Sequence, residues 1–252
     1  MLEGLLKYLQ GPEAEQLRKH FVFRIVPMLN PDGVIYGNYR CSLLGCDLNR
    51  KWDKPNRLLH PPVFYSKQLI RHMQAERKVL LYCDLHGHSR KKNAFFYGCC
   101  YKNYEQEGRV KNAQMRLIPL MCCQKNELFK LKDCRFRIER NKESTARVVV
   151  FKEFNIQNSF TLESSFYAKE DKSLTAKRKQ LNQLTIQEYN SMGTTLVQTM
   201  NSYLPSEQYK LQFLSGKILD VFYDEFIKFV PPYILKREEE KRKKLEESGL
   251  GH

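Results

Sequence analysis

The sequence predicts an α/β fold, because short apolar runs alternate with segments that have helical spacing. The clearest run, at residues 79–83 (VLLYC), is short enough for a buried strand and ends in DLHGHS. In α/β enzymes the binding crevice lies beyond the carboxyl ends of the strands. His86 is therefore a candidate metal ligand or catalytic base, although His86 and His88 are equally compatible with simple loop hydrogen bonding. A length of 252 residues with 42% hydrophobic content suits one such domain with an appendage.

The first 62 residues predict two helices, one strand and a long irregular segment. Helical patterns cover 2–10, closed by Gly11-Pro12, and 13–19. The run FVFRIVPM at 21–28 is rich in β-formers and predicts a strand. A turn signal, NPDG, follows it, and residues 34–62 lack periodicity. Loops of that length are uncommon in compact domains and often carry function.

The middle of the chain predicts further alternation of strands and helices. Helices are expected at 63–77 and at 105–124, with a break or kink at Pro119. Strands are expected at 79–85, 94–98, 129–138, 146–153 and 156–163. The β-branched residues of ARVVVFKE are the reason for the strand at 146–153.

The character of the chain changes after residue 170. Residues 172–179 are basic and polar, which indicates a loop or a helix start. Helical patterns follow at 183–203 and 206–230, separated at Pro205, and a tail of mixed charge runs from 236 to 247. We therefore expect a main domain over 1–205 and a helical, charged C-terminal extension over 206–252.

Composition narrows the classes of protein and partner. The formal charge of +15 predicts affinity for acidic partners, and no nucleic-acid-binding module is evident. No apolar run approaches the roughly 20 residues of a membrane span, and residues 1–16 lack the features of a signal peptide. We therefore expect an intracellular protein whose eight cysteines are free thiols. The adjacent pairs Cys99-Cys100 and Cys122-Cys123 do not have the spacing of a structural zinc site.

Four stretches, taken in order, resemble the zinc carboxypeptidase family, in particular its cytosolic branch, which trims glutamates from tubulin and other acidic proteins. They are NPDGVIYGNYR at 30–40, DLNRKW at 47–52, DLHGHS at 84–89 and SFTLESSF at 159–166. The resemblance covers roughly residues 1–205. It implies a central mixed parallel and antiparallel sheet flanked by helices, zinc as cofactor, acidic protein tails as partners, and a cytosolic location with association to microtubules or cilia.

The resemblance also implies a role for each matching residue. His86 corresponds to a zinc ligand, Glu163 to the general base, and Arg40 to the residue that stabilises the oxyanion. Asn49 and Arg50 correspond to the pair that holds the substrate's terminal carboxylate. These roles suit the chemistry, because a carboxylate can relay a proton from water to the leaving amine, and a guanidinium binds carboxylates through a fork of donors.

Each of these residues also has a simpler interpretation. Arg40 and Arg50 are compatible with surface ion pairs, Glu163 with a solvated carboxylate at a strand end, and Asn49 with a local turn. Arg147 falls where the cytosolic branch carries a basic residue for a glutamate side chain. The alternative is that Arg147 is an edge-strand cation. His88 is expected to orient a ligand or to hydrogen-bond a loop rather than bind zinc.

One element of the family pattern is missing. A His-x-x-Glu motif, which supplies two zinc ligands, should precede NPDG, but His20 is followed by Phe21-Val22-Phe23. We therefore expect a catalytic domain truncated at its N-terminus, with weak zinc binding and little hydrolysis, since catalytic zinc sites use three protein ligands. Two alternatives to a carboxypeptidase remain open. One is a non-catalytic module that binds acidic tails, and the other is a basic nucleic-acid binder.

Overall fold

The computed structural model describes residues 1–102, 106–170 and 182–213. The chain divides into two compact units, Met1–Tyr203 and Leu204–His252, and the architecture below is that of the first. Its helices are α1 (Leu2–Gln10), α2 (Glu15–His20), α3 (Pro31–Tyr36), α4 (Pro61–Glu76), α5 (Gln106–Lys125), α6 (Ala146–Phe154) and α7 (Ile186–Phe213, whose last residues belong to the second unit). Its strands are β1 (Leu81–His88), β2 (Ala94–Tyr97), β3 (Asn158–Ser165), β4 (Ala168–Lys169) and β5 (Asn182–Gln183).

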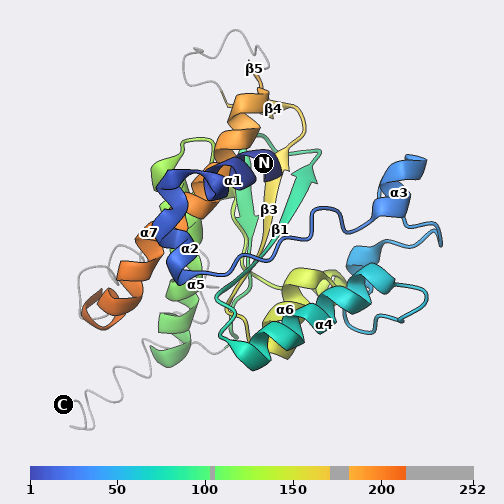
Figure 1. Ribbon diagram of the computed structural model, residues 1–252, viewed down its shortest axis with the longest axis horizontal. Coiled ribbons are helices and arrows are strands. Elements are labelled where there is room, and N and C mark those ends of the chain that lie inside the picture. The colour runs from blue at the N-terminus through green and yellow to red at the C-terminus, as the bar shows by residue number, and fades with distance from the viewer. Residues whose placement is uncertain (103–105, 171–181, 214–252) are drawn as a thin grey trace, which may run out of the picture. The chain divides into compact units, whose positions relative to one another are not determined.

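The main sheet contains three of the described strands in the order β1-β3-β2 (Figure 1). β1 pairs with β3 in parallel, and β2 pairs with β3 in the antiparallel sense. The predicted α/β fold with a mixed sheet is therefore confirmed. β3 lies in the centre and all of its residues are buried, whereas every residue of β1 is partly exposed.

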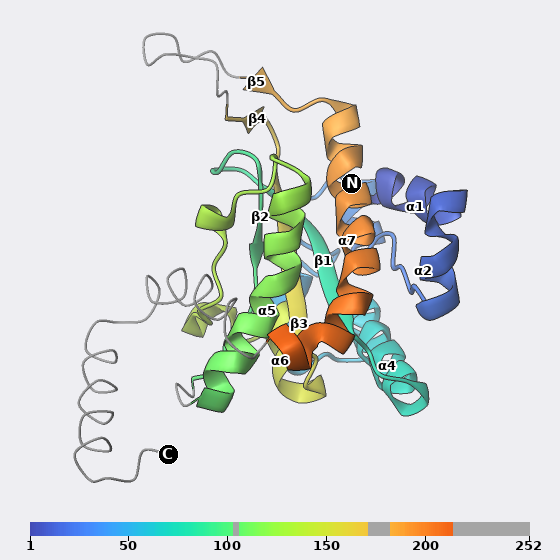
Figure 2. The ribbon, with the colours of Figure 1, turned by 90° about the vertical axis from the view of Figure 1, so that its left-hand side faces the viewer.

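Helices pack on both faces of this sheet. Figures 1 and 2 show α5 and α7 on one face and α4 with α6 on the other. The first face has the larger core, which joins the apolar strand residues Phe96, Phe160 and Leu162 to Ile118 of α5 and Leu196 of α7. The second core lies between α4 and α6 and is made by Leu48, Trp52, Val63, Ile70, Ala146, Val149, Val150, Phe154 and Ile156.

The two-residue period of the strands assigns their side chains to these faces. Phe160 and Leu162 of β3 enter the larger core, so Ser159, Thr161 and Glu163 point to the opposite face. In agreement, the Ser159 hydroxyl donates to the carbonyl of Arg147 in α6 at 2.7 Å. The polar side chains of β3 thus lie on the face covered by α6.

Most of the predicted elements are confirmed within a few residues. They include the helices at 2–10, 63–77, 105–124 and 183–203 and the strands at 79–85, 94–98 and 156–163. The short helix expected at 13–19 is a 3₁₀ turn followed by α2. The segment expected to be irregular contains α3, whose first turn is capped by the Asn30 side chain accepting from the Gly33 N–H.

The strand predicted at 146–153 is wrong, because these residues form helix α6. Val149 and Val150 face the core beside α4, whereas Val148 and Phe151 pack in a third cluster with Cys99 and Met115. A helix that is buried on several sides has no polar stripe, so its sequence resembles that of a buried strand. The alternative interpretation of Arg147 as an edge-strand cation is wrong for the same reason.

Two further strand predictions are also wrong. Residues 21–28 form no strand, and in the described chain no backbone hydrogen bond pairs residues 22–28. β propensity is realised only when a neighbouring strand is available for pairing. Residues 129–138 contain a 3₁₀ turn, Leu131–Asp133, and form isolated bridges with β2 at Phe129 and Arg135 in place of a continuous strand.

The two prolines expected to interrupt helices do not end them. α5 continues through Pro119, and α7 continues past Pro205 to Phe213. Proline removes one backbone hydrogen bond, which a long helix with packed neighbours can tolerate. The predictions for 172–179 and for the tail at 236–247 lie outside the described residues, as does the part of 206–230 beyond Phe213.

Helices α1 and α7 approach each other closely through glycine. A Cβ at Gly193 would overlap the carbonyl oxygen of Met1, and one at Gly4 would overlap the backbone of Asn190. Thr194 of α7 also donates through its hydroxyl to the Gly4 carbonyl at 3.0 Å. The N-terminal helix is therefore fastened to α7 by backbone contact that larger residues would prevent.

The cysteines are all free, as predicted. Burial raises the pKa of Cys99 and of Cys122 to about 12, so these thiols stay protonated at neutral pH. Among the described helices, none is both long enough and apolar enough to span a membrane.

The central position of β3 generates a stability prediction. Replacing fully buried Leu162 with alanine should lower the free energy of unfolding by about 2–5 kcal/mol, through lost burial and the cavity left behind. Leu58 is 85% exposed, so Leu58→Ala should change it by less than about 0.5 kcal/mol. Urea unfolding of both variants measures the difference, and equal effects would contradict the assignment of β3 as the core strand.

Candidate active site

His86 and Glu163 meet at the carboxyl ends of two parallel strands. The register of β1 and β3 places the two residues directly opposite each other. Their side chains lie on the face covered by α6, and His86 Nδ1 is 3.4 Å from Glu163 Oε2. Two segments almost 80 residues apart in sequence are thus joined at the edge where α/β sheets commonly bind ligands.

The pair is electrostatically coupled. The adjacent Glu163 carboxylate raises the pKa of His86 to about 9, in opposition to the effect of burial. The Glu163 side chain is only 9% exposed, and its Oε2 makes no well-aligned hydrogen bond within the described structure. Asp84, two residues before His86 on the same face, has its pKa raised by burial. Glu163 is therefore a buried carboxylate whose Oε2 faces the His86 ring, and not the solvated strand-end carboxylate of the simpler interpretation.

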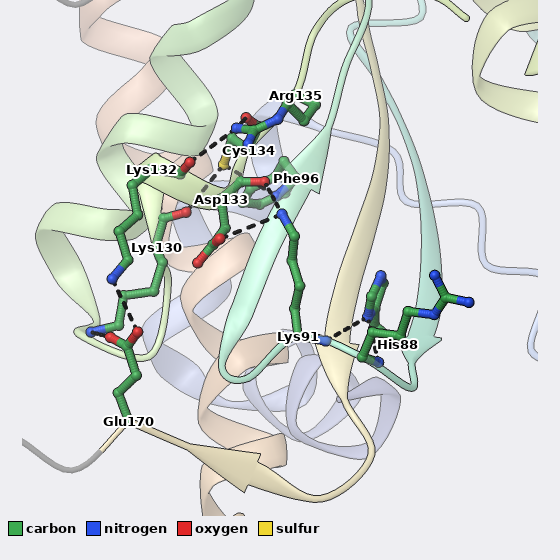
Figure 3. Close-up of polar contacts among 10 residues, drawn as sticks. His88, Lys91, Phe96, Lys130, Lys132, Asp133, Cys134, Arg135 and Glu170 are labelled. Carbon is green, nitrogen blue, oxygen red and sulfur yellow. Dashed lines mark hydrogen bonds and ion pairs between the residues drawn. The ribbon is translucent and has the colours of Figure 1, made fainter.

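His88 organises the turn after β1. Its Nδ1 accepts from the backbone N–H groups of Arg90 and Lys91, each at 3.0 Å. Figure 3 shows this turn beside the side chain of Lys91, whose Nζ donates to the Asp133 carbonyl at 3.0 Å. Burial lowers the pKa of His88, which suits a neutral ring that accepts at Nδ1. The prediction that His88 hydrogen-bonds a loop is confirmed.

The second cluster lies on the loop that carries DLNRKW. Asp47 Oδ2 is 3.6 Å from Arg40 Nη1 and 4.0 Å from Arg50 Nη1. Arg50 Nη1 also donates to the carbonyl of Asn49 at 2.9 Å. Arg40 and Arg50 thus share one acidic partner and remain partly exposed, which leaves donors available to a ligand.

Asn49 joins this loop to helix α6. Its Oδ1 accepts from the Ala146 N–H at 2.9 Å, whereas Thr145, at the N-cap position, makes no capping bond of its own. Asn49 therefore caps α6 from a distant part of the sequence and leaves its Nδ2 group as a donor for another partner. The simpler interpretation of Asn49 as a local turn residue is insufficient.

Trp52 and Lys67 hold the rest of the loop in place. Trp52 is 1% exposed and packs edge-on against Tyr82, and its backbone N–H donates to the Ser144 carbonyl at 3.2 Å. Lys67 of α4 is buried, donates to the Trp52 carbonyl at 2.7 Å and pairs with Glu153 of α6 at 2.8 Å. The loop is thus anchored to both helices of the second core.

Arg147 follows Ala146 in the first turn of α6 and is 6% exposed. Its Nη1 donates to the Gly98 carbonyl, and its guanidinium lies 5.8 Å from the ring centre of Tyr97. Burial lowers its pKa, and among the described residues no carboxylate forms an ion pair with it. A buried guanidinium that lacks an acidic partner favours an anionic ligand.

Tyr97 was not predicted from the sequence, although the period of β2 could have indicated it. Phe95 pairs with Glu163 and Tyr97 pairs with Thr161, so both rings lie on the face of Glu163. Charges on Glu163 and Arg147 both influence the pKa of Tyr97, which is raised mainly by burial. Tyr97 therefore lies on the face of the sheet that carries Glu163, with its ring centre 5.8 Å from the guanidinium of Arg147. Asp47 was also missed, because its contacts with both arginines depend on the folded loop.

The described residues do not form a metal site. No group of three or more His, Cys, Asp or Glu side chains within them is arranged to hold a metal ion. His86 is one imidazole beside one carboxylate, whereas catalytic zinc uses three protein ligands. The donor set of the described chain therefore does not fit zinc without additional ligands.

The sequence and the fold define the class of this protein. The family model described as "Zinc carboxypeptidase" matches residues 1–226, and the chain belongs to that family. Among solved structures, a putative carboxypeptidase from Burkholderia mallei shares the fold with a TM-score of 0.67 and 23% identity, over 81% of this chain and 52% of that one. A metallo-carboxypeptidase from Pseudomonas aeruginosa has a TM-score of 0.65 and 22% identity, with the same coverage.

Within the family, the chain is similar to cytosolic carboxypeptidases. It is 45% identical over 176 residues to cytosolic carboxypeptidase 1 of Danio rerio, which covers 66% of this chain and 15% of the relative. It is 38% identical over 221 residues to cytosolic carboxypeptidase 2 of Xenopus tropicalis, which covers 86% of this chain and 22% of the relative. The chain thus matches less than a quarter of the length of either relative.

The cap that Asn49 forms on α6 generates a prediction that separates the capping role of its side chain from its role as a donor to a ligand. Asn49→Ala should lower the free energy of unfolding by about 1 kcal/mol, because α6 loses its cap. Asn49→Asp keeps an acceptor oxygen at the helix N-terminus and should remain close to the wild type. Exposed Asn141→Ala is the control, and urea unfolding is the measurement. If Asn49→Asp lowered the free energy of unfolding as much as Asn49→Ala does, the capping role would be contradicted.

Proposed function

We propose that this chain forms part of the catalytic domain of a metallocarboxypeptidase that removes C-terminal or branch-point glutamates from acidic protein tails such as those of tubulin. The observation that carries the proposal is the bond from the Ala146 N–H to the Asn49 Oδ1, which ties the loop of Arg40 and Arg50 to the helix of Arg147. The same helix packs on the face of the sheet that carries Glu163 and His86, through the bond from the Ser159 hydroxyl to the Arg147 carbonyl. We further propose that the protein works in the cytosol, where such tails are found.

Carboxylate recognition follows from the charges of this cluster. Arg50 with the free Nδ2 group of Asn49 offers the forked donors that suit a terminal carboxylate. Arg147, buried and without an acidic partner in the described structure, suits the side-chain carboxylate of a glutamate. The net charge of +15 favours the approach of acidic tails over a longer range.

Glu163 is proposed to move the proton. A carboxylate at this position can take a proton from an attacking water and return it to the leaving amine, and its Oε2 makes no hydrogen bond among the described residues. Arg40 is proposed to stabilise the negative charge that develops on the substrate carbonyl oxygen. Both roles are transferred from the family through matching residues, and the burial of Glu163 supports the first.

We also propose that His86 is one of three zinc ligands and that the other two belong to polypeptide outside this sequence. Support comes from the unpaired edge of β1, which pairs only with β3 among the described strands. Residues 21–28 have strand-like sequence and unpaired backbone, and their Val22, Val26 and Met28 side chains are 46–50% exposed. A further strand beside β1 would satisfy these backbone groups and cover these side chains.

A second candidate function is a binding module without catalysis, because the described residues hold no set of three metal ligands. Such a module would recognise polyglutamylated tails through Asn49, Arg50 and Arg147 and release no glutamate. The carboxypeptidase hypothesis and the binding-module hypothesis predict the same affinity for the peptide, so only the release of glutamate distinguishes them.

The carboxylate site generates a binding prediction for the chain as it stands. A labelled peptide ending in three glutamates should bind more tightly with a free C-terminal carboxylate than as its C-terminal amide. Arg50→Gln and Asn49→Asp should each reduce this preference by about tenfold, since one charge-assisted contact is worth about 1.5 kcal/mol or more. Exposed Arg24→Gln, which removes the same charge, should leave the preference unchanged. Equal affinities for acid and amide would overturn the proposed site.

The catalytic proposal is tested in a longer version of the protein that carries the additional zinc ligands. That version should hold about one zinc per chain and release glutamate, and Glu163→Gln should abolish release without loss of zinc. The present chain should bind little zinc under the same conditions. Metal analysis and an assay of free glutamate measure both properties. Full zinc occupancy with no glutamate release would favour the binding module instead.

A further inference from the structure

Asp47 is an acidic partner that Arg40 and Arg50 share. Its Oδ2 is 3.6 Å from Arg40 Nη1 and 4.0 Å from Arg50 Nη1. Its other oxygen, Oδ1, accepts from the Asn49 N–H at 2.9 Å. One side chain therefore contacts three of the residues proposed to bind or to polarise the substrate.

The backbone of the loop enforces this arrangement. Cys41 and Asp47 form an antiparallel bridge, and the Ser42 N–H donates to the Cys46 carbonyl at 3.0 Å. These contacts close the loop 42–46, so Arg40, just before the bridge, lies beside Asp47 at its other end. The side chain of Asp47 is 22% exposed, whereas those of Arg40 and Arg50 are 47% and 32% exposed.

We propose that Asp47 is a positioning residue that holds two guanidiniums side by side, that of Arg50 toward the substrate's terminal carboxylate and that of Arg40 toward its carbonyl oxygen. The inference rests on the proposed function and adds a residue to it. Two guanidiniums held close to each other repel, and a carboxylate shared between them offsets that repulsion. One negative charge against two positive charges still leaves a net positive site for the ligand.

The distances support positioning rather than full neutralisation. Contacts of 3.6 and 4.0 Å are longer than the 2.7–2.9 Å typical of charge-assisted hydrogen bonds. Asp47 therefore does not occupy the guanidinium donors in the way that a bound carboxylate would. If Asp47 bound the guanidiniums more tightly, it would compete with the substrate for their donors. Without Asp47, the two arginines would move apart.

The simpler interpretation is that Asp47 only caps the 3₁₀ turn Leu48–Arg50. Asp47→Asn distinguishes the two roles, because asparagine keeps an acceptor for the Asn49 N–H but carries no charge. Asp53→Asn is the matched control. It removes the same charge from an exposed residue of the same loop that makes no ion pair among the described residues.

The experiment compares the affinities of the full chain for the labelled triglutamate peptide and for its C-terminal amide at physiological salt. We expect Asp47→Asn to lower the acid-to-amide preference at least threefold, with the thermal midpoint unchanged. Asp53→Asn should keep the wild-type preference. Arg50→Gln is measured in parallel, because its loss of preference reports on the carboxylate site itself.

Each result is decisive. A wild-type preference in Asp47→Asn, together with a loss in Arg50→Gln, would overturn the positioning role and leave the proposed function intact. An increased preference in Asp47→Asn would also overturn it, because Asp47 would then act as a competitor of the ligand. If the wild-type chain does not distinguish acid from amide, the proposed function fails and the role of Asp47 fails with it.

Discussion

The parallel pairing of β1 with β3 is the constraint on which the candidate site depends. The register sets His86 opposite Glu163, and a slip by one residue would turn Glu163 toward the apolar core formed with α5 and α7. Buried Phe160 and Leu162 prevent that slip, because they occupy the alternate positions of the same strand. The position of the polar pair is therefore fixed by the apolar residues on the opposite face.

The second cluster depends on tertiary contacts instead of strand register. The loop that carries Arg50 has little regular structure, yet it is tied to α6 by Asn49, to α4 by Lys67 and to the second core by Trp52. Loops that bind ligands work best when a rigid scaffold positions them. Here the scaffold is the packed pair α4 and α6, so changes in that core should reach the carboxylate-binding residues.

The sequence was most informative where a local pattern determined the structure. The strand end with His86 was predicted because an apolar run changes abruptly to polar residues, whereas Glu163 was selected through the resemblance of SFTLESSF to the family. Helix α6 was not predicted, because a helix buried on several sides has no periodic polar face. Residues 21–28 form no strand in the described structure, because a strand needs a neighbouring strand with which to pair. The contacts of Asp47 and Asn49 join residues brought together only by the folded chain, and no local pattern encodes them.

The close contact between α1 and α7 has a consequence for synthesis of the protein. The hydroxyl of Thr194 bonds to Gly4, 190 residues earlier, and the two glycines allow the backbones to touch. Chains emerge from the ribosome N-terminus first, at about 5–20 residues per second. Helix α1 must therefore wait for α7 to be translated, for roughly ten seconds or more at those rates. During that interval the surface of α1 that packs on α7 lacks its partner.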